Sequence, residues 1–348
     1  MARKQMKYEI IKPYIEKKLV SEQVHPEDPN VRIFNYTQMC QFAGEWDEVT
    51  KQCRGLIMNV ETGEILARPF PKFFNYQEHV AKNWLIPAEE CVITEKLDGS
   101  LGIMYTLKGK TWIATRGSFM SDQAQWATKW WRENKGDEPY GNEITHLFEI
   151  IYPENRIVVN YDFSGLVHLA SIDTKTGVQV ESQMPVRKVK NIDSKNVLDL
   201  LKQDDPNSEG FVIYYPQANT RVKIKFPEYV RLHRIVTGVS EIAIWEMLRD
   251  EKPIADLLEK VPDEFYKWVS EVQFRLMKQY ADIKTRCTND FEAIAQAGRS
   301  RKEIALGFQE MKYPGILFAM LDNKDYKLAI WRLIRPHGRS QFKVDIDA

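Results

Sequence analysis

The spacing of apolar residues changes near residue 236, and this change limits the possible folds more than any other feature of the chain. Residues 31–226 consist mostly of short apolar runs with alternating polarity, separated by turns such as the one at residues 61–64. This texture is typical of β-strands joined by tight connections. Residues 239–282 and 288–308 instead repeat their apolar positions with the period of a helix. The pattern predicts an α+β chain, in which a domain of antiparallel sheets with flanking helices precedes an all-α domain.

The same change of pattern sets the expected domain organisation. We expect one domain over residues 1–238 and a helical C-terminal domain over residues 239–348. The length fits two domains, because a typical domain has about 100–200 residues. At the start of the first domain, residues 1–30 predict a polar helix followed by a loop that contains two prolines.

Composition excludes several classes of protein. Lys plus Arg and Asp plus Glu both number 49, so the formal net charge is zero. This argues against a surface coated in basic residues for bulk binding to nucleic acid or membrane, although a local basic groove is compatible with it. No apolar run approaches the ~18 residues of a transmembrane helix, and we expect no signal peptide. Four scattered cysteines without a C-x-x-C pair fit a reducing cytoplasm. We therefore expect a cytoplasmic protein that is a monomer without a membrane partner.

The most informative segment is residues 94–100, Thr-Glu-Lys-Leu-Asp-Gly-Ser, which lies between two apolar strands. It places Lys96 where a strand ends, with Asp98 two residues later and Gly99 for the turn. A lysine is a nucleophile only when its amine is neutral, and burial or nearby cations can lower a lysine pKa enough for that. Taken alone, the segment is better explained by a hairpin turn with a solvated Lys–Asp pair.

Three further motifs change this balance. Glu149 follows a phenylalanine at the end of an apolar stretch, and Glu209 precedes a glycine that opens another strand. Residues 222–226 alternate strictly, so Lys223 and Lys225 point to the same face of their strand. Two cations side by side repel each other unless an anion such as a triphosphate lies against them. Each motif alone fits an ordinary strand-end acid or a solvated face, but together they compose a site with a lysine nucleophile, carboxylates for metal and lysines for phosphate.

In this order the four motifs resemble those of the covalent nucleotidyltransferases, the superfamily of polynucleotide ligases and RNA capping enzymes. The chain is most similar to the ATP-dependent RNA ligase 1 family of T-even phages, over about residues 31–234. The matching segments are residues 32–36, 53–55, 67–69, 72–75, 98–101, 117–118, 155–158, 223–225, 229–230 and 232–233. Leu97 departs from the family, which has an acid there, and Arg116 replaces a lysine. Beyond residue 240 there is no convincing match.

The resemblance implies a reaction and a role for each residue. Lys96 would attack the α-phosphorus of ATP to form lysyl-AMP, with Mg²⁺ or Mn²⁺ as the metal. AMP would then pass to an RNA 5′-phosphate, and a 3′-hydroxyl would displace it. The implied ATP contacts are Tyr36, Arg54, Lys72, Phe74, Glu95, Glu149, Glu209, Lys223 and Lys225. The implied metal contacts, direct or through water, are Asp98, Glu149 and Glu209, and the implied RNA contacts are Arg116, Tyr229 and Arg231.

Several related functions compete with this interpretation. Nick-sealing DNA ligases and capping enzymes usually carry an OB barrel after the Lys-x-Lys strand, whereas this chain continues with helical pattern. That difference favours an RNA ligase, and we expect it to join single-stranded ends that carry a 5′-phosphate and a 3′-hydroxyl. A nick-sealing RNA or DNA ligase and a catalytically inactive nucleotide- or RNA-binding module remain as alternatives. An NAD-dependent ligase is disfavoured, because nothing before Tyr36 looks like a nicotinamide-recognition domain.

Overall fold

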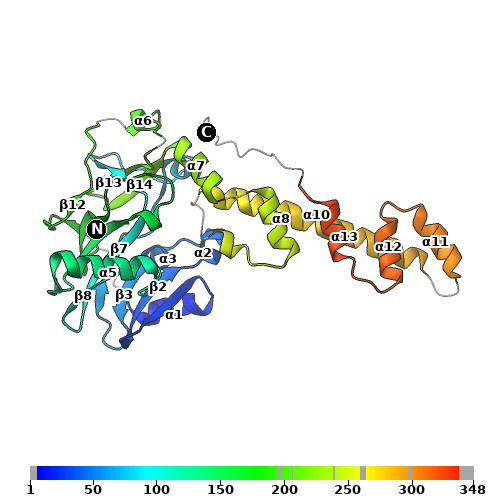
Figure 1. The fold of residues 1–348 in the computed structure, drawn as a ribbon, viewed down its shortest axis with the longest axis horizontal. Coiled ribbons are helices and arrows are strands. Elements are labelled where there is room, and N and C mark those ends of the chain that lie inside the picture. Colours follow the sequence, from blue (N-terminus) through cyan, green and yellow to red (C-terminus); the bar gives the residue numbers. More distant parts are fainter. Residues whose placement is uncertain are drawn as a thin grey trace. The chain divides into compact units, whose positions relative to one another are not determined.

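The chain forms two compact units, one ending at Val236 and the other beginning at Thr237 (Figure 1). The computed structural model describes residues 6–194, 197–205, 207–237, 240–258, 264–295 and 299–336. The first unit contains three sheets with flanking helices, and the described residues of the second form helices and their connections, without a strand. The predicted α+β class with a helical C-terminal region is therefore confirmed.

The first sheet is antiparallel throughout, in the strand order β1-β2-β3-β4. Its strands are β1 (Val20–His25), β2 (Asp28–Tyr36), β3 (Arg54–Asn59) and β4 (Ile65–Ala67). Helices α1 (Tyr8–Glu16) and α3 (Glu48–Gln52) pack against this sheet, where Ile11 and Val49 join Phe34 in one buried cluster. The short helix α2 (Gln38–Ala43) follows β2.

The second sheet is formed by strands from the middle of the sequence and carries a long helix on one face. Its main path is β11-β10-β9-β7-β8, and β12 pairs with β10 in parallel. Helix α5 buries Ala127 and Trp131 against Phe148 of this sheet, and Ser121 caps the helix by accepting a hydrogen bond from the Ala124 amide. The elements are β7 (Ser100–Leu107), β8 (Lys110–Ala114), α5 (Asp122–Lys135), β9 (Ile144–Ile151), a 3₁₀ turn (Pro153–Asn155), β10 (Gly165–Asp173), β11 (Gln179–Val180) and β12 (Arg187–Lys188).

The third sheet gathers strands from distant parts of the sequence in the order β5-β14-β13-β6. Strand β13 is antiparallel to both neighbours, whereas the two-residue β5 runs parallel to β14. The elements are β5 (Phe74–Asn75), α4 (Tyr76–Ala81), β6 (Val92–Lys96), α6 (Val197–Leu200), β13 (Gly210–Tyr215), β14 (Thr220–Lys225) and α7 (Pro227–Thr237). Strand β6 belongs to this sheet and β7 to the second, so residues 97–99 connect the two sheets.

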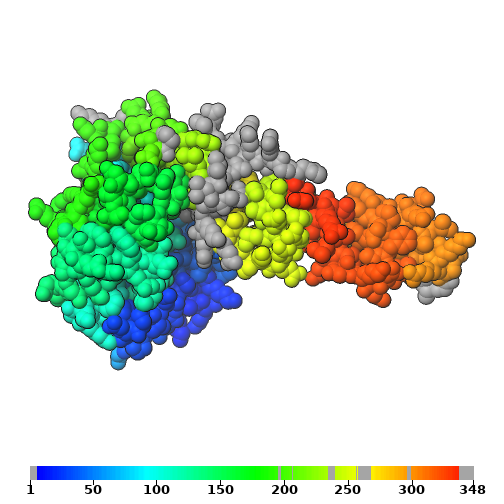
Figure 2. Space-filling view, viewed as in Figure 1, coloured from blue at the N-terminus to red at the C-terminus, as the bar shows by residue number. Residues whose placement is uncertain are grey.

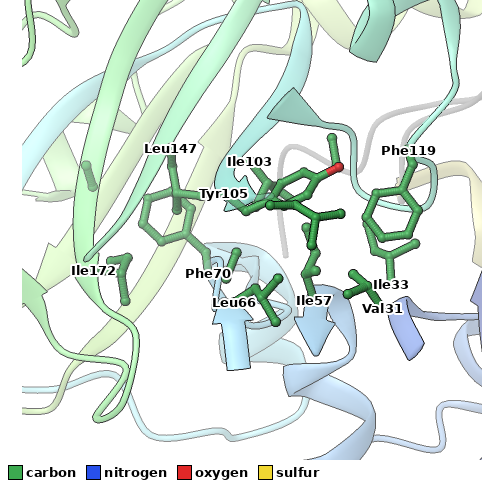
Figure 3. Packing of buried hydrophobic residues seen from close by; sticks show 14 residues of the cluster. Val31, Ile33, Ile57, Leu66, Phe70, Ile103, Tyr105, Phe119, Leu147 and Ile172 are labelled. Atoms are coloured by element: carbon green, nitrogen blue, oxygen red, sulfur yellow. The ribbon is translucent and has the colours of Figure 1, made fainter. Parts of the chain in front are cut away.

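The main hydrophobic core lies between the first and second sheets. Figure 3 shows the side chains of the two sheets pointing toward one another, with the Phe70 ring between them. Ile57 of the first sheet and Ile103 of the second are both fully buried. The other labelled members are Val31, Ile33, Leu66, Tyr105, Phe119, Leu147 and Ile172.

The second unit has a core of its own around the long helix α10. Cys287 and Ile294 of α10 pack with Phe308, Leu317 and other apolar residues of the following helices. The indole of Trp245 donates a hydrogen bond of 2.9 Å to the Trp331 carbonyl. In the space-filling view the orange and red residues of α11 to α13 form one continuous surface (Figure 2). The elements are α8 (Glu241–Arg249), α9 (Ala255–Leu258), α10 (Glu264–Ile294), α11 (Arg301–Gln309), α12 (Pro314–Leu321) and α13 (Lys327–Leu333).

One local prediction is wrong. The loop expected after the first helix is a β-hairpin formed by β1 and β2. Pro26 lies in its turn, and Pro29 lies in β2 before that strand begins to pair with β3 at Val31. Neither ring therefore removes a hydrogen bond between β2 and β3. In the described part of the chain, no helix is both long and apolar enough to span a membrane.

The core between the sheets gives a direct test of the packing. Ile103→Ala should lower the free energy of unfolding of the first unit by about 2–5 kcal/mol, because the substitution leaves a cavity in a fully buried position. Val24→Ala, at a residue that is 47% exposed on β1, should change it by no more than about 0.5 kcal/mol. Urea denaturation of both variants measures the difference. Equal, small effects would contradict the placement of Ile103 between the two sheets.

Candidate active site

Strand register brings three distant parts of the sequence together. On the central strand β13, Gly210 pairs with Lys96 of β6 on one side and with Lys225 of β14 on the other. Glu209 precedes Gly210, and its carboxylate meets both lysines: Lys96 Nζ lies 2.6 Å from Oε2 and Lys225 Nζ lies 3.2 Å from Oε1. One carboxylate therefore holds two ammonium groups at the end of the third sheet.

Glu209 is an anion in the protein interior. It is only 4% exposed, and burial alone would raise the pKa of its carboxyl group. The ammonium groups of Lys96 and Lys225 outweigh this effect and hold the pKa of Glu209 below its usual range. Two lysines share this one carboxylate, so the group of three residues carries an excess of positive charge.

The glycine between these residues is required by the backbone. Gly210 has a φ of +139°, and a Cβ atom added there would lie 2.0 Å from the Ile224 carbonyl oxygen. Any side chain would therefore push β14, which carries Lys225, away from β13. The glycine of the Lys-x-Asp-Gly segment is similarly constrained, because a Cβ at Gly99 would lie 2.6 Å from the Ile150 carbonyl oxygen.

Asp98 fixes the turn that follows Lys96. Its Oδ2 atom accepts hydrogen bonds from the amides of Val158 and Val159 at 2.8 and 2.9 Å, and its Oδ1 atom accepts one from the Tyr229 hydroxyl at 2.8 Å. The Asp98 amide donates to the Tyr161 hydroxyl at 2.7 Å. Four contacts thus tie the turn to the loop after β9 and to helix α7.

This network bears on two expectations from the sequence. Asp98, an expected metal contact, is 4% exposed, and its carboxylate accepts hydrogen bonds from three donors that hold the turn. Tyr229 is 2% exposed and donates to Asp98, so its ring is not available to stack on an RNA base. Both residues belong to the internal scaffold of the site.

Glu149 reaches the same region from the second sheet. It lies on β9 between Leu101 of β7 and Val167 of β10. Burial raises the pKa of Glu149 to about 8, and the nearby carboxylates of Glu209 and Asp98 add to this effect, against the opposing charge of Lys96. Among the described residues, the Glu149 carboxyl group makes no hydrogen bond or ion pair that ties it to the scaffold.

A second cation sits among aromatic rings. Lys72 is 6% exposed, and its ammonium lies 5.4 Å from the ring centroids of Tyr36, Trp46 and Phe74. The Arg116 guanidinium lies over Tyr36 and donates a hydrogen bond of 3.0 Å to its hydroxyl. Phe74 belongs to β5, which pairs with β14 beside Lys223. Trp46 is not among the residues expected from the sequence, because its position before a helix cap carries no functional signal.

The remaining residues predicted from the sequence differ in burial and in their hydrogen-bond partners. Lys223 is 7% exposed on β14, and Arg54 begins β3, where its charge acts on Glu149. Glu95 instead accepts a hydrogen bond of 3.0 Å from the Lys190 amide. Arg231 is exposed on α7 and pairs with Glu228 at 2.7 Å. In the part of the chain that the structure describes, no three His, Cys, Asp or Glu side chains are grouped to hold a metal ion directly.

Removing the shared carboxylate should destabilise the first unit. Glu209→Gln takes away the anion that Lys96 and Lys225 share, and we expect a loss of about 3 kcal/mol in the free energy of unfolding. Glu133→Gln is the matched control, because its 3.8 Å pair with Lys129 is exposed and should change stability by less than about 0.5 kcal/mol. Chemical denaturation of both variants near pH 7 measures the two losses. A loss for Glu209→Gln no larger than the control would contradict the shared ion pair.

Glu149 should make stability depend on pH in a defined direction. Its pKa is raised from 4.5 to about 8, so between these values the folded state keeps a proton that the unfolded state releases. The free energy of unfolding should therefore fall as pH rises through this range and level off above it. Glu149→Gln cannot titrate, so its stability relative to the original protein should grow with pH between about 4.5 and 8. Parallel pH–stability curves for the two proteins would show that the Glu149 pKa is not raised.

Comparison of the sequence with known proteins shows the family of the chain. A family model for RNA ligase matches residues 52–229, just over half of the chain. The chain is 25% identical over 288 residues to a putative RNA ligase of Thermovibrio ammonificans, covering 75% of this chain and 73% of that protein. It is 22% identical to the RNA ligase of Rhodothermus phage RM378, covering 85% and 86% of the two chains. Among solved structures, an archaeal ATP-dependent RNA ligase matches 74% of this chain and 70% of its own, at 13% identity and a TM-score of 0.45.

The matched residues include the Lys-x-Asp-Gly turn, both glutamates and the Lys-x-Lys strand. Among them, Lys96 and Lys225 meet the Glu209 carboxylate. The chain belongs to the ATP-dependent RNA ligase family of the T4 RNA ligase 1 type.

Proposed function

We propose that this protein joins the 5′-phosphate and 3′-hydroxyl ends of single-stranded RNA through an AMP adduct on Lys96. The observation that carries the proposal is the convergence of Lys96 and Lys225 on the buried Glu209 carboxylate. A solvated surface lysine does not require a buried carboxylate as its partner. The family supports RNA as the substrate class, and the site chemistry supports lysine as the nucleophile.

In the first step the Lys96 amine attacks the α-phosphorus of ATP. A nitrogen–phosphorus bond forms, the bond from the α-phosphorus to the bridging oxygen breaks, and pyrophosphate leaves. The amine must first lose its proton, since an ammonium has no lone pair for attack. Glu209 holds the Lys96 side chain in place at 2.6 Å, and its carboxylate is within reach to accept the proton that leaves the amine.

The cations around Lys96 suit the phosphates of ATP. Lys223 and Lys225 lie on the strand beside Glu209, and Arg54 lies close enough to influence Glu149. Negative charge grows on the leaving pyrophosphate, and fixed cations stabilise it without reorganisation. Lys72 is held by its three aromatic neighbours and would meet the same phosphates. In this arrangement Tyr36 and Phe74 act mainly by orienting Lys72.

The carboxylates fit a hydrated Mg²⁺ or Mn²⁺ ion. The Glu149 carboxyl group is not committed to the scaffold, whereas Asp98 is, and the described residues offer no group of three ligands. Mg²⁺ keeps most of its waters and takes few protein carboxylates, so Glu149 with Glu209 would hold it through water. Bound with ATP, the ion would neutralise phosphate charge.

The later steps transfer AMP and seal the strand. The RNA 5′-phosphate displaces Lys96 from the adduct, giving an adenylylated RNA end. The 3′-hydroxyl oxygen then attacks the phosphorus of that end, forming the phosphodiester and releasing AMP. Arg116 and the exposed Arg231 are the proposed contacts to RNA near these ends.

We assign this chemistry to a domain of residues 1–238 and propose that residues 239–348 select among RNA ends. Every residue with a proposed role in nucleotide chemistry precedes residue 226. From residue 241 to the end the chain carries 18 acidic and 18 basic residues, which gives no bulk attraction for RNA.

The nucleophile can be tested directly with α-labelled ATP. Lys96→Ala should retain no covalent label after denaturation in detergent, because no other side chain replaces its amine. Lys96→Arg should fail as well, since a guanidinium stays protonated at any relevant pH. Lys129→Ala, on the exposed face of α5, should label like the original protein.

The outcomes separate the alternatives. Full labelling of a folded Lys96→Ala variant would show that Lys96 is not the nucleophile. An original protein that takes no label would indicate an inactive binding module. Labelling followed by sealing of nicked duplexes, with no joining of single-stranded ends, would indicate a nick-sealing ligase.

A further inference from the structure

A short segment connects the second and third sheets beside the strand that carries Lys96. Its first residues form β12, which pairs with Val167 and His168 of β10. Its end lies along β6, where the Glu95 amide donates to the Lys190 carbonyl at 3.0 Å. The Ile192 amide also donates to the Ile93 carbonyl at 2.9 Å. The segment therefore lies directly beside β6, the strand that carries Lys96.

Three exposed cations project from this segment. Val189 is 5% exposed and packs in a cluster with Leu97, the residue after Lys96. Arg187, Lys188 and Lys190 around it are exposed, and we call these three residues the basic strip. The buried valine anchors the backbone, so the three charges are presented to solvent from a fixed support.

The charges of the basic strip are weakly neutralised within the protein. Lys188 pairs with Glu181 at 3.7 Å, but the two side chains are 57% and 91% exposed, so this pair contributes little. Among the described residues, Arg187 and Lys190 form no ion pair. At the end of the strip, the Glu95 carboxylate accepts a hydrogen bond from the Lys190 amide. Positive charge is therefore left available for an external anion.

An aromatic path links the strip to the reacting lysine. The Arg187 guanidinium lies 4.0 Å from the ring centroid of Phe163, which is partly exposed. The Phe163 and Tyr161 rings are 5.6 Å apart, and the Tyr161 hydroxyl accepts the hydrogen bond from the Asp98 amide. The chain of contacts thus runs from Arg187 to the turn that follows Lys96.

We propose that the basic strip, with Phe163, binds the phosphodiester backbone of the RNA strand whose end is joined at Lys96; this inference rests on the proposed function. A guanidinium stacked on an aromatic ring keeps its donors free for phosphate oxygens. Cations interleaved with aromatic rings are typical of surfaces that follow a single strand. The triphosphate of ATP could supply the same anion, so the experiment must distinguish RNA from ATP.

The experiment uses the full chain and two readouts. Fluorescence anisotropy measures the affinity for a short, labelled, 5′-phosphorylated single-stranded RNA at several salt concentrations. Self-adenylylation at varied ATP concentration measures the KM for ATP. The variants are the double change Arg187→Ala with Lys190→Ala, and single changes of Lys190 to Ala, Glu and Arg, which leave the Arg187–Phe163 contact intact. Lys175→Ala removes an exposed lysine at the turn after β10 and is the matched control.

The double variant should bind RNA more weakly, and the slope of log affinity against log salt should fall by about 0.7 for each RNA phosphate that the strip no longer neutralises. Lys190→Glu should weaken RNA binding more than Lys190→Ala, and Lys190→Arg should bind like the original protein. The KM for ATP should stay unchanged in every variant, and the control should bind RNA normally. Unchanged RNA affinity and slope would overturn the inference, as would a raised KM for ATP with RNA affinity intact. An original protein that binds RNA but takes no label from ATP would instead refute the proposed function.

Discussion

The site depends on one carboxylate that two lysines share. Glu209 precedes the glycine of β13 that pairs with both Lys96 and Lys225, so the position of each charge follows from the register of three strands. A shift of one residue on either side would turn one lysine to the opposite face of the sheet. Gly210 protects this register, because a side chain there would collide with the backbone of β14. The fold and the chemistry therefore rest on the same pairing.

The scaffold around this pairing explains why a second acid has a structural role. Asp98 joins the turn after Lys96 to the loop after β9 and to α7 through Tyr229. Glu149 approaches from the second sheet with a carboxyl group that is not tied to this network, and burial raises its pKa to about 8. Glu209 is thus an ion-pair partner, Asp98 is a scaffold residue, and Glu149 is not committed to either role. All three belong to short motifs in the sequence, which do not distinguish these roles.

The class of fold is predictable from the sequence, because the alternation of strands and the later helical period are local properties. The shared face of Lys223 and Lys225 is predictable too, since alternation on one strand determines it. The pairing of Lys96, Gly210 and Lys225 is not, because that register joins distant segments. Tyr229 stands between Lys225 and Arg231 in the sequence, and an aromatic ring between cations has the same pattern on an RNA-binding surface and in the interior. Only packing against Asp98 distinguishes the two.

The central claim is that, of the clustered lysines, Lys96 alone becomes the nucleophile. The most direct measurement is to incubate the full chain with ATP and Mg²⁺, digest it under conditions that preserve phosphoramidates, and locate AMP by mass spectrometry. The account predicts that AMP is found on the peptide containing Lys96, with the peptides containing Lys223 and Lys225 unmodified. AMP on Lys225 would show that Glu209 selects the opposite partner and would contradict the account.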